Sequence, residues 1–433
     1  MKLFFISITL LLIFTACSKD SNNNTEPTTA RRTVIIYMSA DNTLSPFTSG
    51  DLQELVNGSY NTVSSSDRLV VFVDRISNIE KPFIARITGN RKQPVDTLYK
   101  YSEDFYASDP KNFTEVFNRI AKLCPANEYG LVLWSHATGW CIEEDTRPSS
   151  APHRSFGIDN GNNANNANNG LWLNIPDMRT CFDQIGIKWK FIFADCCNMS
   201  CVEVAYELRN NADWLIGSPA EIPGDGAPYK EMVKHFFSQS DSLYKDIINE
   251  YTNAYKYFDY ETNEYKNYLP LSAIRLSEME SLATATKAVL PAVAEHLQQG
   301  DAIATNGIIY YFAPGGRYDN ANKTMYDMND MIRTALSEQP EAYNTWHEAF
   351  LKAVPPVYIV SERWQTNYNG GLGTINFNEF IVTAAKQGCV SMFFPLDKYN
   401  SPNCLHPYNT DIQKMQWYQA VGWSTAGWST VGY

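Results

Sequence analysis

Short apolar runs alternate with amphipathic segments along this chain, and that alternation constrains its fold more than any other feature. Buried strands are predicted where β-branched and aromatic residues cluster, at residues 33–40, 69–74, 129–135, 189–194 and 214–217. Helices are predicted between them, at residues 51–58, 113–123, 175–185 and 202–209. Strands alternating with helices indicate βαβ units, and hence an α/β fold whose largely parallel sheet is flanked by helices on both faces.

The remaining segments extend this pattern more loosely. Residues 80–102 alternate as in a hairpin, and the Asn-rich residues 141–170 are typical of a long exposed loop. Further helices are predicted at residues 276–298, 324–338, 343–354 and 409–421, and further strands at residues 307–312, 356–361 and 389–394. Because no linker-like change in composition divides residues 33–433, they are predicted to form one domain, with a core at about 33–240 and a C-terminal extension at about 241–433 packed on it.

The N-terminal residues predict export and a membrane anchor. Lys2 followed by the apolar residues 3–14 is typical of a signal peptide, and this run is too short to span a membrane. Ala16 precedes Cys17 as at a bacterial lipoprotein cleavage site, where the new N-terminal Cys is acylated. Residues 1–17 are therefore predicted to be a lipoprotein signal peptide, and residues 18–32 a flexible tether. The expected location is the bacterial cell envelope, with the protein lipid-anchored to a membrane.

Net charge and cysteine spacing argue against two classes of protein. Lys and Arg number 35 against 47 Asp and Glu, a formal charge of −12, whereas a nucleic-acid-binding protein would show a basic patch. No CxxC…CxxC pattern indicates a zinc site, and a chain of 433 residues needs no disulfide framework. Free thiols are therefore predicted at the cysteines that follow Cys17, namely Cys124, Cys141, Cys181, Cys196, Cys197, Cys201, Cys389 and Cys404.

Two strand ends carry residues able to act as a nucleophile and its base. The strand at 129–135 leads directly into His136, and the strand at 189–194 is followed closely by Cys196 and Cys197. Functional groups of a parallel sheet collect at the carboxyl ends of its strands. A His and a Cys there could form a dyad, in which the imidazole takes the thiol proton and the thiolate attacks a carbonyl. A structural His beside buried thiols would explain the same residues, so the pattern alone leaves both interpretations open.

The sequence around these residues resembles the catalytic blocks of the clostripain family of cysteine peptidases. LVLWSHATGW is similar to the block that carries the family's general base, which assigns that role to His136. FADCCNMSCVEVAYEL follows the pattern Asp-x-Cys-x-Met-x-x-x-Glu-x-x-x-Glu-Leu, which makes Cys197 the nucleophile. The other matching residues are Asp195, Met199, Glu203, Glu207 and Leu208. IYMSADNTLS, YDMNDMIRTAL and MQWYQAVGW extend the resemblance over nearly the whole mature chain, which implies a caspase-like fold and a cysteine endopeptidase.

The resemblance also implies where substrate binds. Members of the family cut after Arg or Lys, and a buried cation needs a desolvated carboxylate partner. Asp195 and Asp225 match acidic residues of the family's primary specificity pocket. The oxyanion hole is expected from the backbone N–H groups of Ala137 and Cys197. Ala137 stands where the family usually has Gly, which would strain the backbone only if this position needed a positive φ.

The sequence also predicts where the chain could cut itself and which cofactors it needs. The loop at 141–170 offers Arg147 and Arg154 for self-cleavage, and Arg154–Ser155 is the better bond because Pro148 follows Arg147. The sequence shows no cofactor requirement and no EF-hand-like loop, although the resemblance admits calcium.

The expected partners are protein or peptide substrates with Arg or Lys at the cleaved bond, and a membrane through the lipid anchor, but no nucleic acid. The alternative function is a catalytically inactive, caspase-like surface module that binds peptides or glycans, for which Ala137 is the only support. A serine hydrolase is disfavoured because the chain has no GxSxG sequence.

Overall fold

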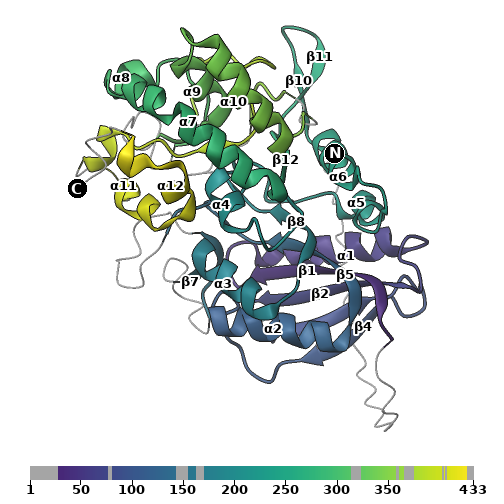
Figure 1. Cartoon of the computed structure of the whole chain (residues 1–433). Coiled ribbons are helices and arrows are strands. Elements are labelled where there is room, and N and C mark those ends of the chain that lie inside the picture. Colours follow the sequence, from purple (N-terminus) through teal and green to yellow (C-terminus); the bar gives the residue numbers. More distant parts are fainter. Residues whose placement is uncertain are drawn as a thin grey trace, which may run out of the picture.

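A mixed sheet of eight strands forms the centre of the structure, a computed structural model (Figure 1). The structure describes residues 28–76, 80–142, 155–161, 170–313, 323–356, 360–364, 375–401, 404 and 407–426. The strands of this sheet are β1 (Ala30–Ala40), β2 (Asp67–Arg75), β3 (Phe83–Ile87), β4 (Val95–Lys100), β5 (Ala126–Trp134), β8 (Trp189–Asp195), β9 (Trp214–Gly217) and β12 (Ser272–Arg275). Their order is β12-β9-β8-β5-β1-β2-β3-β4. The run from β9 to β2 is parallel and the outer strands are antiparallel, so the predicted largely parallel sheet is confirmed.

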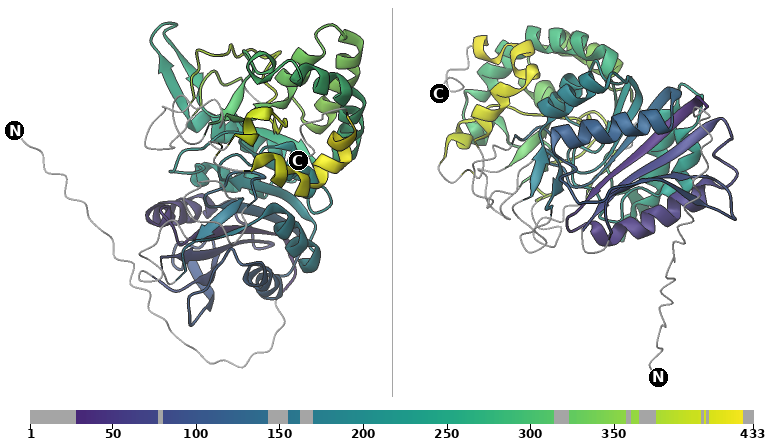
Figure 2. Two further views of the ribbon diagram at one scale, coloured as in Figure 1. Left: turned by 90° about the vertical axis from the view of Figure 1, so that its left-hand side faces the viewer. Right: turned by 90° about the horizontal axis from the view of Figure 1, so that it is seen from below.

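Helices cover both faces of this sheet because its central strands are apolar on both sides. In β1, Ile35 and Tyr37 pack into one core cluster, whereas Val34, Ile36 and Met38 pack into the other. The first cluster includes side chains of α2 (Pro110–Leu123), α3 (Ile175–Ile185) and α4 (Val202–Glu207). The second includes side chains of α1 (Thr48–Ser59), α5 (Tyr229–Phe236) and α6 (Leu243–Ala254). Figure 2 shows α1 and α2 on opposite faces of the sheet.

The prediction of an exposed loop at 141–170 is wrong for part of that segment. Phe156–Asp159 forms strand β6, which is buried and pairs with β7 (Leu171–Leu173). This strand was missed because it is only four residues long and contains Gly157, so no alternating pattern marks it. Arg147 and Arg154, the residues predicted as self-cleavage sites, lie outside the described residues.

The C-terminal half packs its own helices and a small sheet against the core. Its main elements are α7 (Met279–Leu297), α8 (Asp301–Ala304), α9 (Met328–Ala335), α10 (Pro340–Ala353), α11 (Tyr408–Asp411), α12 (Gln416–Val421) and the strands β13 (Tyr310–Phe312), β14 (Thr324–Asp327) and β15 (Ser391–Met392). The helix predicted from 324 is wrong for its first four residues, which pair as β14 between β13 and β15. The helix predicted at 409–421 is broken at Met415, whose backbone is extended.

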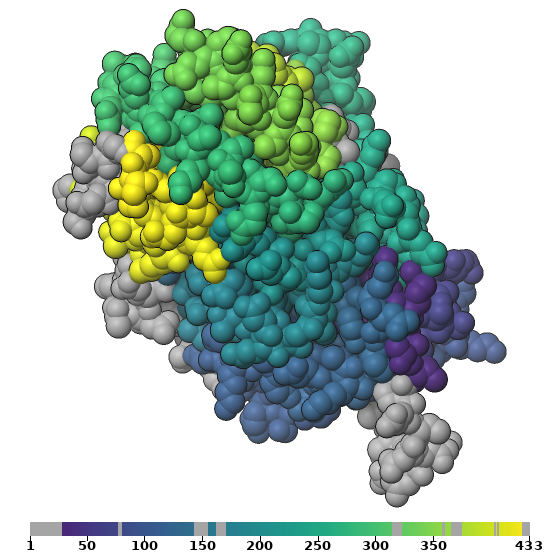
Figure 3. All heavy atoms as spheres, in the orientation of Figure 1, coloured from purple at the N-terminus to yellow at the C-terminus, as the bar shows by residue number. Residues whose placement is uncertain are grey.

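Figure 3 shows the C-terminal segments gathered on one side of the molecule and the N-terminal segments on the other. The two sides nevertheless share the main sheet. Strand β12 lies beyond the predicted boundary at about 240, yet it pairs antiparallel with β9 and forms one edge of that sheet. In the described part of the chain, no helix is long and apolar enough to cross a membrane.

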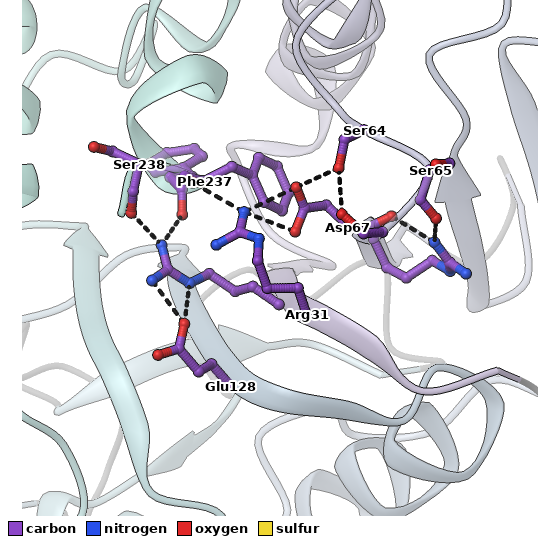
Figure 4. Close-up of polar contacts among 11 residues, drawn as sticks. Arg31, Ser64, Ser65, Asp67, Glu128, Phe237 and Ser238 are labelled. Atoms are coloured by element: carbon purple, nitrogen blue, oxygen red, sulfur yellow. Dashed lines mark hydrogen bonds and ion pairs between the residues drawn. The ribbon is translucent and has the colours of Figure 1, made fainter. Parts of the chain in front are cut away.

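Two arginines fix the amino end of β1 to the end of α5. Arg31 forms an ion pair with Asp67 at 2.8 Å and donates to the carbonyl oxygen of Phe237 at 3.0 Å (Figure 4). Arg32 is 2% exposed and donates to the carbonyl oxygens of Phe236 and Ser238. Cations at the end of a helix satisfy its free carbonyl groups and oppose its dipole. These contacts hold the amino end of β1, and the chemistry is expected at the opposite, carboxyl ends of the parallel strands.

Candidate active site

His136 and Cys197 lie at the same edge of the sheet because their strands are neighbours in register. Trp134, the last residue of β5, pairs with Asp195, the last residue of β8. Each candidate residue follows two positions later, and neighbouring strands lie about 4.8 Å apart. The structure therefore places at neighbouring strand ends two residues whose numbers differ by 197 − 136 = 61.

Cys197 differs from the cysteines beside it in its exposure. Cys196 and Cys201 are fully buried, whereas Cys197 is partly exposed. Its Sγ accepts the backbone N–H of Ile222 at 3.4 Å. Burial, with a smaller contribution from Glu221, raises the pKa of the Cys197 thiol to about 12. Of these three cysteines only Cys197 is partly exposed, and its raised pKa keeps it in the thiol form.

His136 is neutral at physiological pH, because burial lowers the pKa of its imidazole to about 4. A neutral imidazole is the form that can accept the thiol proton, so the pair suits general-base activation of Cys197 during attack. Removal of the proton before substrate binds would leave a buried thiolate, which is costly.

Thr43 holds the imidazole of His136 and was missed by the sequence analysis. Its Oγ1 lies 2.8 Å from Nε2 of His136. The loop that carries Thr43 is fixed by Asn42, whose side chain donates to the carbonyl oxygens of Ser39 and Ile158. If Nε2 donates to Thr43, then Nδ1 is left without a proton and can accept one from the thiol. Only the position of Thr43 just after the first strand could have suggested this contact.

We expect Thr43→Val to lower kcat about 5-fold with little change in KM, because one orienting hydrogen bond contributes about 1 kcal/mol. Steady-state kinetics would measure both constants. Thr43→Ser keeps the hydroxyl and should restore most of kcat. An unchanged kcat in Thr43→Val would show that the hydroxyl does not orient the ring.

Ala137 adopts an unstrained backbone conformation. It is absent from the described non-glycine residues with positive φ, which are Asn61, Asn198, Asn263, Met325 and Cys389. Ala137 faces Phe156 as an isolated antiparallel bridge, in which Thr138 donates to Ser155 and Gly157 donates to His136. In such a pair the N–H of Ala137 points away from the partner strand. The N–H therefore does not bond to the partner strand, and the residue that departs from the family pattern introduces no strain.

The two predicted pocket carboxylates occupy different depths. Asp195 is 3% exposed and accepts hydrogen bonds from the Ala227 N–H and from the hydroxyls of Tyr229 and Tyr251, at 3.0, 2.7 and 2.9 Å. Burial raises the pKa of its carboxyl. Asp225 is exposed, in the turn that is closed by the hydrogen bond from the Gly226 N–H to the carbonyl oxygen of Pro223. Both lie close enough to Tyr255 to raise the pKa of its phenol, after burial. The structure thus places one carboxylate deep and one at the surface of the same region.

Buried carboxyl groups also gather beside the Thr43 loop, at Asp41, Asp74, Asp104 and Asp159. Burial, followed by the charges of Asp159 and Asp104, raises the pKa of Asp41 to about 7. Burial and contact with Asp159 raise the pKa of Asp74 well above its ordinary value. Burial therefore makes these carboxyl groups harder to ionise than exposed ones.

We expect the stability gained by Asp41→Asn to grow with pH. A carboxyl whose pKa is raised from 3.8 to about 7 by folding stabilises the fold fully below the lower value, and this contribution is lost as pH rises through the higher one. The amide does not titrate, so the Tm of the variant should exceed that of the wild type more at pH 8 than at pH 5. Thermal unfolding across this range measures the difference. Asp177→Asn, at an exposed position on α3, is the control. A difference that is the same at every pH would contradict the expectation.

The structure also shows the state of the cysteines and of the side chains that could bind a metal ion. All eight cysteines after Cys17 are free, as predicted, and only Cys197 and Cys404 are partly exposed. No group of three or more His, Cys, Asp or Glu side chains in the described ranges is placed to hold a metal ion. Cys17 lies outside the described residues.

Known proteins resemble this chain in sequence and in fold. A family model described as the clostripain family matches residues 36–428. A secreted C11 cysteine protease from Bacteroides thetaiotaomicron, solved with an irreversible peptide inhibitor, is 27% identical, with a TM-score of 0.71 over 92% of this chain and 100% of that one. An inactive zymogen C11 protease from Parabacteroides distasonis is 23% identical, with a TM-score of 0.68 over 91% and 99% of the two chains, and so supports the fold. A search of curated proteins finds no match.

Proposed function

We propose that this chain, which belongs to the clostripain family and is a cysteine endopeptidase, cuts after Arg or Lys. In this proposal Cys197 is the nucleophile and His136 is the base. The observation that supports the specificity is the buried carboxylate of Asp195, two residues before the nucleophile. The exposed Asp225 lies in the same region. A buried carboxylate binds a cationic side chain more strongly than a neutral one. The reason is that the cation compensates a negative charge that water no longer solvates.

The proposed mechanism uses the neutral dyad. His136 takes the Sγ proton as Cys197 attacks the carbonyl carbon of the scissile bond, and the N–H groups of Ala137 and Cys197 bind the oxyanion. The imidazolium then protonates the leaving amine, which leaves a thioester on Cys197. Water, deprotonated by His136, attacks the thioester and releases the new carboxylate together with the thiol.

We further propose that the enzyme acts in the bacterial envelope. The secreted relative from Bacteroides thetaiotaomicron supports export. Lipid anchoring at Cys17 rests on the sequence of residues 1–17 alone. Mass spectrometry of the protein purified from membranes, compared with Cys17→Ala, tests for the acyl chains.

The specificity is tested with peptide reporters that carry Arg, Lys, Asp or Leu before the cleaved bond. The protein without residues 1–17 should cleave the Arg and Lys peptides at least ~100-fold faster in kcat/KM, given the cost of leaving a buried charge unpaired. Equal rates on Leu and Arg peptides would overturn the specificity and leave the peptidase assignment intact.

We expect self-cleavage at Arg154–Ser155 to be slow. Ser155 is fully buried, and its hydroxyl donates to the carbonyl oxygen of Cys141 at 2.6 Å, so this segment must leave its place before the bond can enter the active site. Purified protein should convert into fragments of roughly one-third and two-thirds of the chain, as the position of the bond dictates. N-terminal sequencing of the larger fragment should begin at Ser155, and Cys197→Ala should stay intact. Full activity in an uncut chain would contradict self-activation.

A further inference from the structure

Asp51 is a buried carboxylate next to the proposed specificity pocket, and nothing in the motifs points to it. It lies in the first turn of α1 and is 5% exposed. Its Oδ2 accepts the indole N–H of Trp134 at 2.7 Å. Trp134 ends β5 and precedes His136 by two residues, so this hydrogen bond ties Asp51 to the strand that carries the base.

The carboxylates of Asp51 and Asp195 both lie next to Gly226. A Cβ atom at Gly226 would lie 3.1 Å from Oδ2 of Asp195 and 3.5 Å from Oδ2 of Asp51. Gly226 has a φ of +68°, and it adjoins Asp225 in the chain. Two carboxylates from separate elements thus converge on the turn that carries a third.

The charges around Asp51 are negative. Burial, followed by the charge of Asp195, raises the pKa of Asp51 to about 8, and Glu54 and Asp225 act in the same direction. The hydrogen bond from Trp134 acts against them. The titratable groups near these carboxylates include the hydroxyls of Tyr229, Tyr251 and Tyr255 and the Cys197 thiol, which stay neutral because burial raises their pKa. The positive charge of a cation that enters this region would favour the ionised forms of the Asp51 and Asp195 carboxyl groups.

We propose that Asp51 is a second specificity-determining carboxylate, which shares the cationic side chain of the substrate with Asp195 and selects Arg over Lys. This inference rests on the proposed Arg/Lys specificity. A planar guanidinium presents several N–H donors in a fixed fork and can bridge two carboxylates, whereas an ammonium acts as a point charge. Loss of Asp51 should therefore weaken Arg substrates more than Lys substrates.

The mature protein and its Asp51→Asn variant would be assayed on three peptides that differ only in Arg, Lys or Gln before the cleaved bond. We expect kcat/KM to fall roughly 100-fold for Arg and roughly 10-fold for Lys, and to stay within about 2-fold for Gln, as removal of one of two charged partners predicts. Glu54→Gln, which removes a partly exposed carboxylate from the same helix, is the matched control and should leave all three ratios within about 2-fold.

The pH dependence gives a second readout, independent of the amount of folded variant. In the wild type, the ratio of kcat/KM for Arg to that for Gln should rise between pH 6 and pH 9, because Asp51 must lose its proton to pair with the guanidinium. The ratio cancels the titration of the shared catalytic groups. Trp134→Phe removes the hydrogen bond that favours the ionised form, so it should move this rise to higher pH.

The outcomes separate the two proposals. A wild type that cleaves Gln and Arg peptides equally would overturn the proposed specificity. A wild type that prefers Arg, with an Asp51→Asn variant that keeps both the Arg-to-Gln ratio and its pH dependence, would overturn the role of Asp51 alone.

Discussion

Cys197→Ala is expected to abolish peptide hydrolysis, with kcat at least ~1000-fold below that of the wild type, because the proposed acyl intermediate forms on the Cys197 sulfur. The structure supports this choice through exposure, since Cys197 is the partly exposed member of its cluster. A fluorogenic peptide assay with active-site titration by an iodoacetamide probe measures both activity and labelling.

Cys196→Ala and Cys201→Ala are the matched controls. Both cysteines are fully buried, so each change removes one sulfur atom from the core and should lower Tm by a few degrees at most while most of the activity is kept. Full activity in Cys197→Ala together with loss in Cys196→Ala would place the nucleophile one residue earlier.

Asp195→Asn is expected to lower kcat/KM on Arg peptides about 100-fold while the protein stays folded. The amide can keep its oxygen toward the Ala227 N–H and turn its NH₂ group to Tyr251, whose hydroxyl can also accept. The hydrogen bonds are thus largely preserved, but the negative charge that the substrate cation needs is lost.

Asp195→Ala distinguishes these two roles. It removes every acceptor, so the buried donors of Ala227, Tyr229 and Tyr251 lose their partner, at a cost of about 1–3 kcal/mol each. Its Tm should fall well below that of Asp195→Asn in a thermal unfolding experiment. An Asp195→Asn variant that still cleaved Arg peptides at the wild-type rate would show that the carboxylate serves only to hold the surrounding loops.

The central elements were predictable because their signal is local. The strand predicted at 214–217 and the helix predicted at 175–185 have the bounds of β9 and α3. A strand buried on both faces needs a continuous apolar run, and a helix packed on a sheet needs an apolar stripe. Short elements lacked such a signal, as β6 did, because four residues with a glycine fit a loop equally well.

The motif glutamates show what a local pattern leaves open. Glu203 and Glu207 were expected on a helix, and both lie on α4. Their partners are far along the chain, since Glu203 accepts the N–H of Phe393 at 2.7 Å and Glu207 accepts that of Gln416 at 2.6 Å. These hydrogen bonds attach the C-terminal extension to the helix that follows the nucleophile, a role that the spacing within the motif cannot express.

The sequence by itself determined the alternation of strands and helices, the edge of the sheet where the chemistry is expected, and the choice of candidate nucleophile and base. Only the tertiary structure decided what surrounds them. Thr43 reaches His136 from 93 positions away, and Asp51 meets Trp134 from 83. Apolar periodicity is recorded in neighbouring residues, whereas a polar side chain finds its partner through the packing of separate elements, which leaves no regular spacing in the chain.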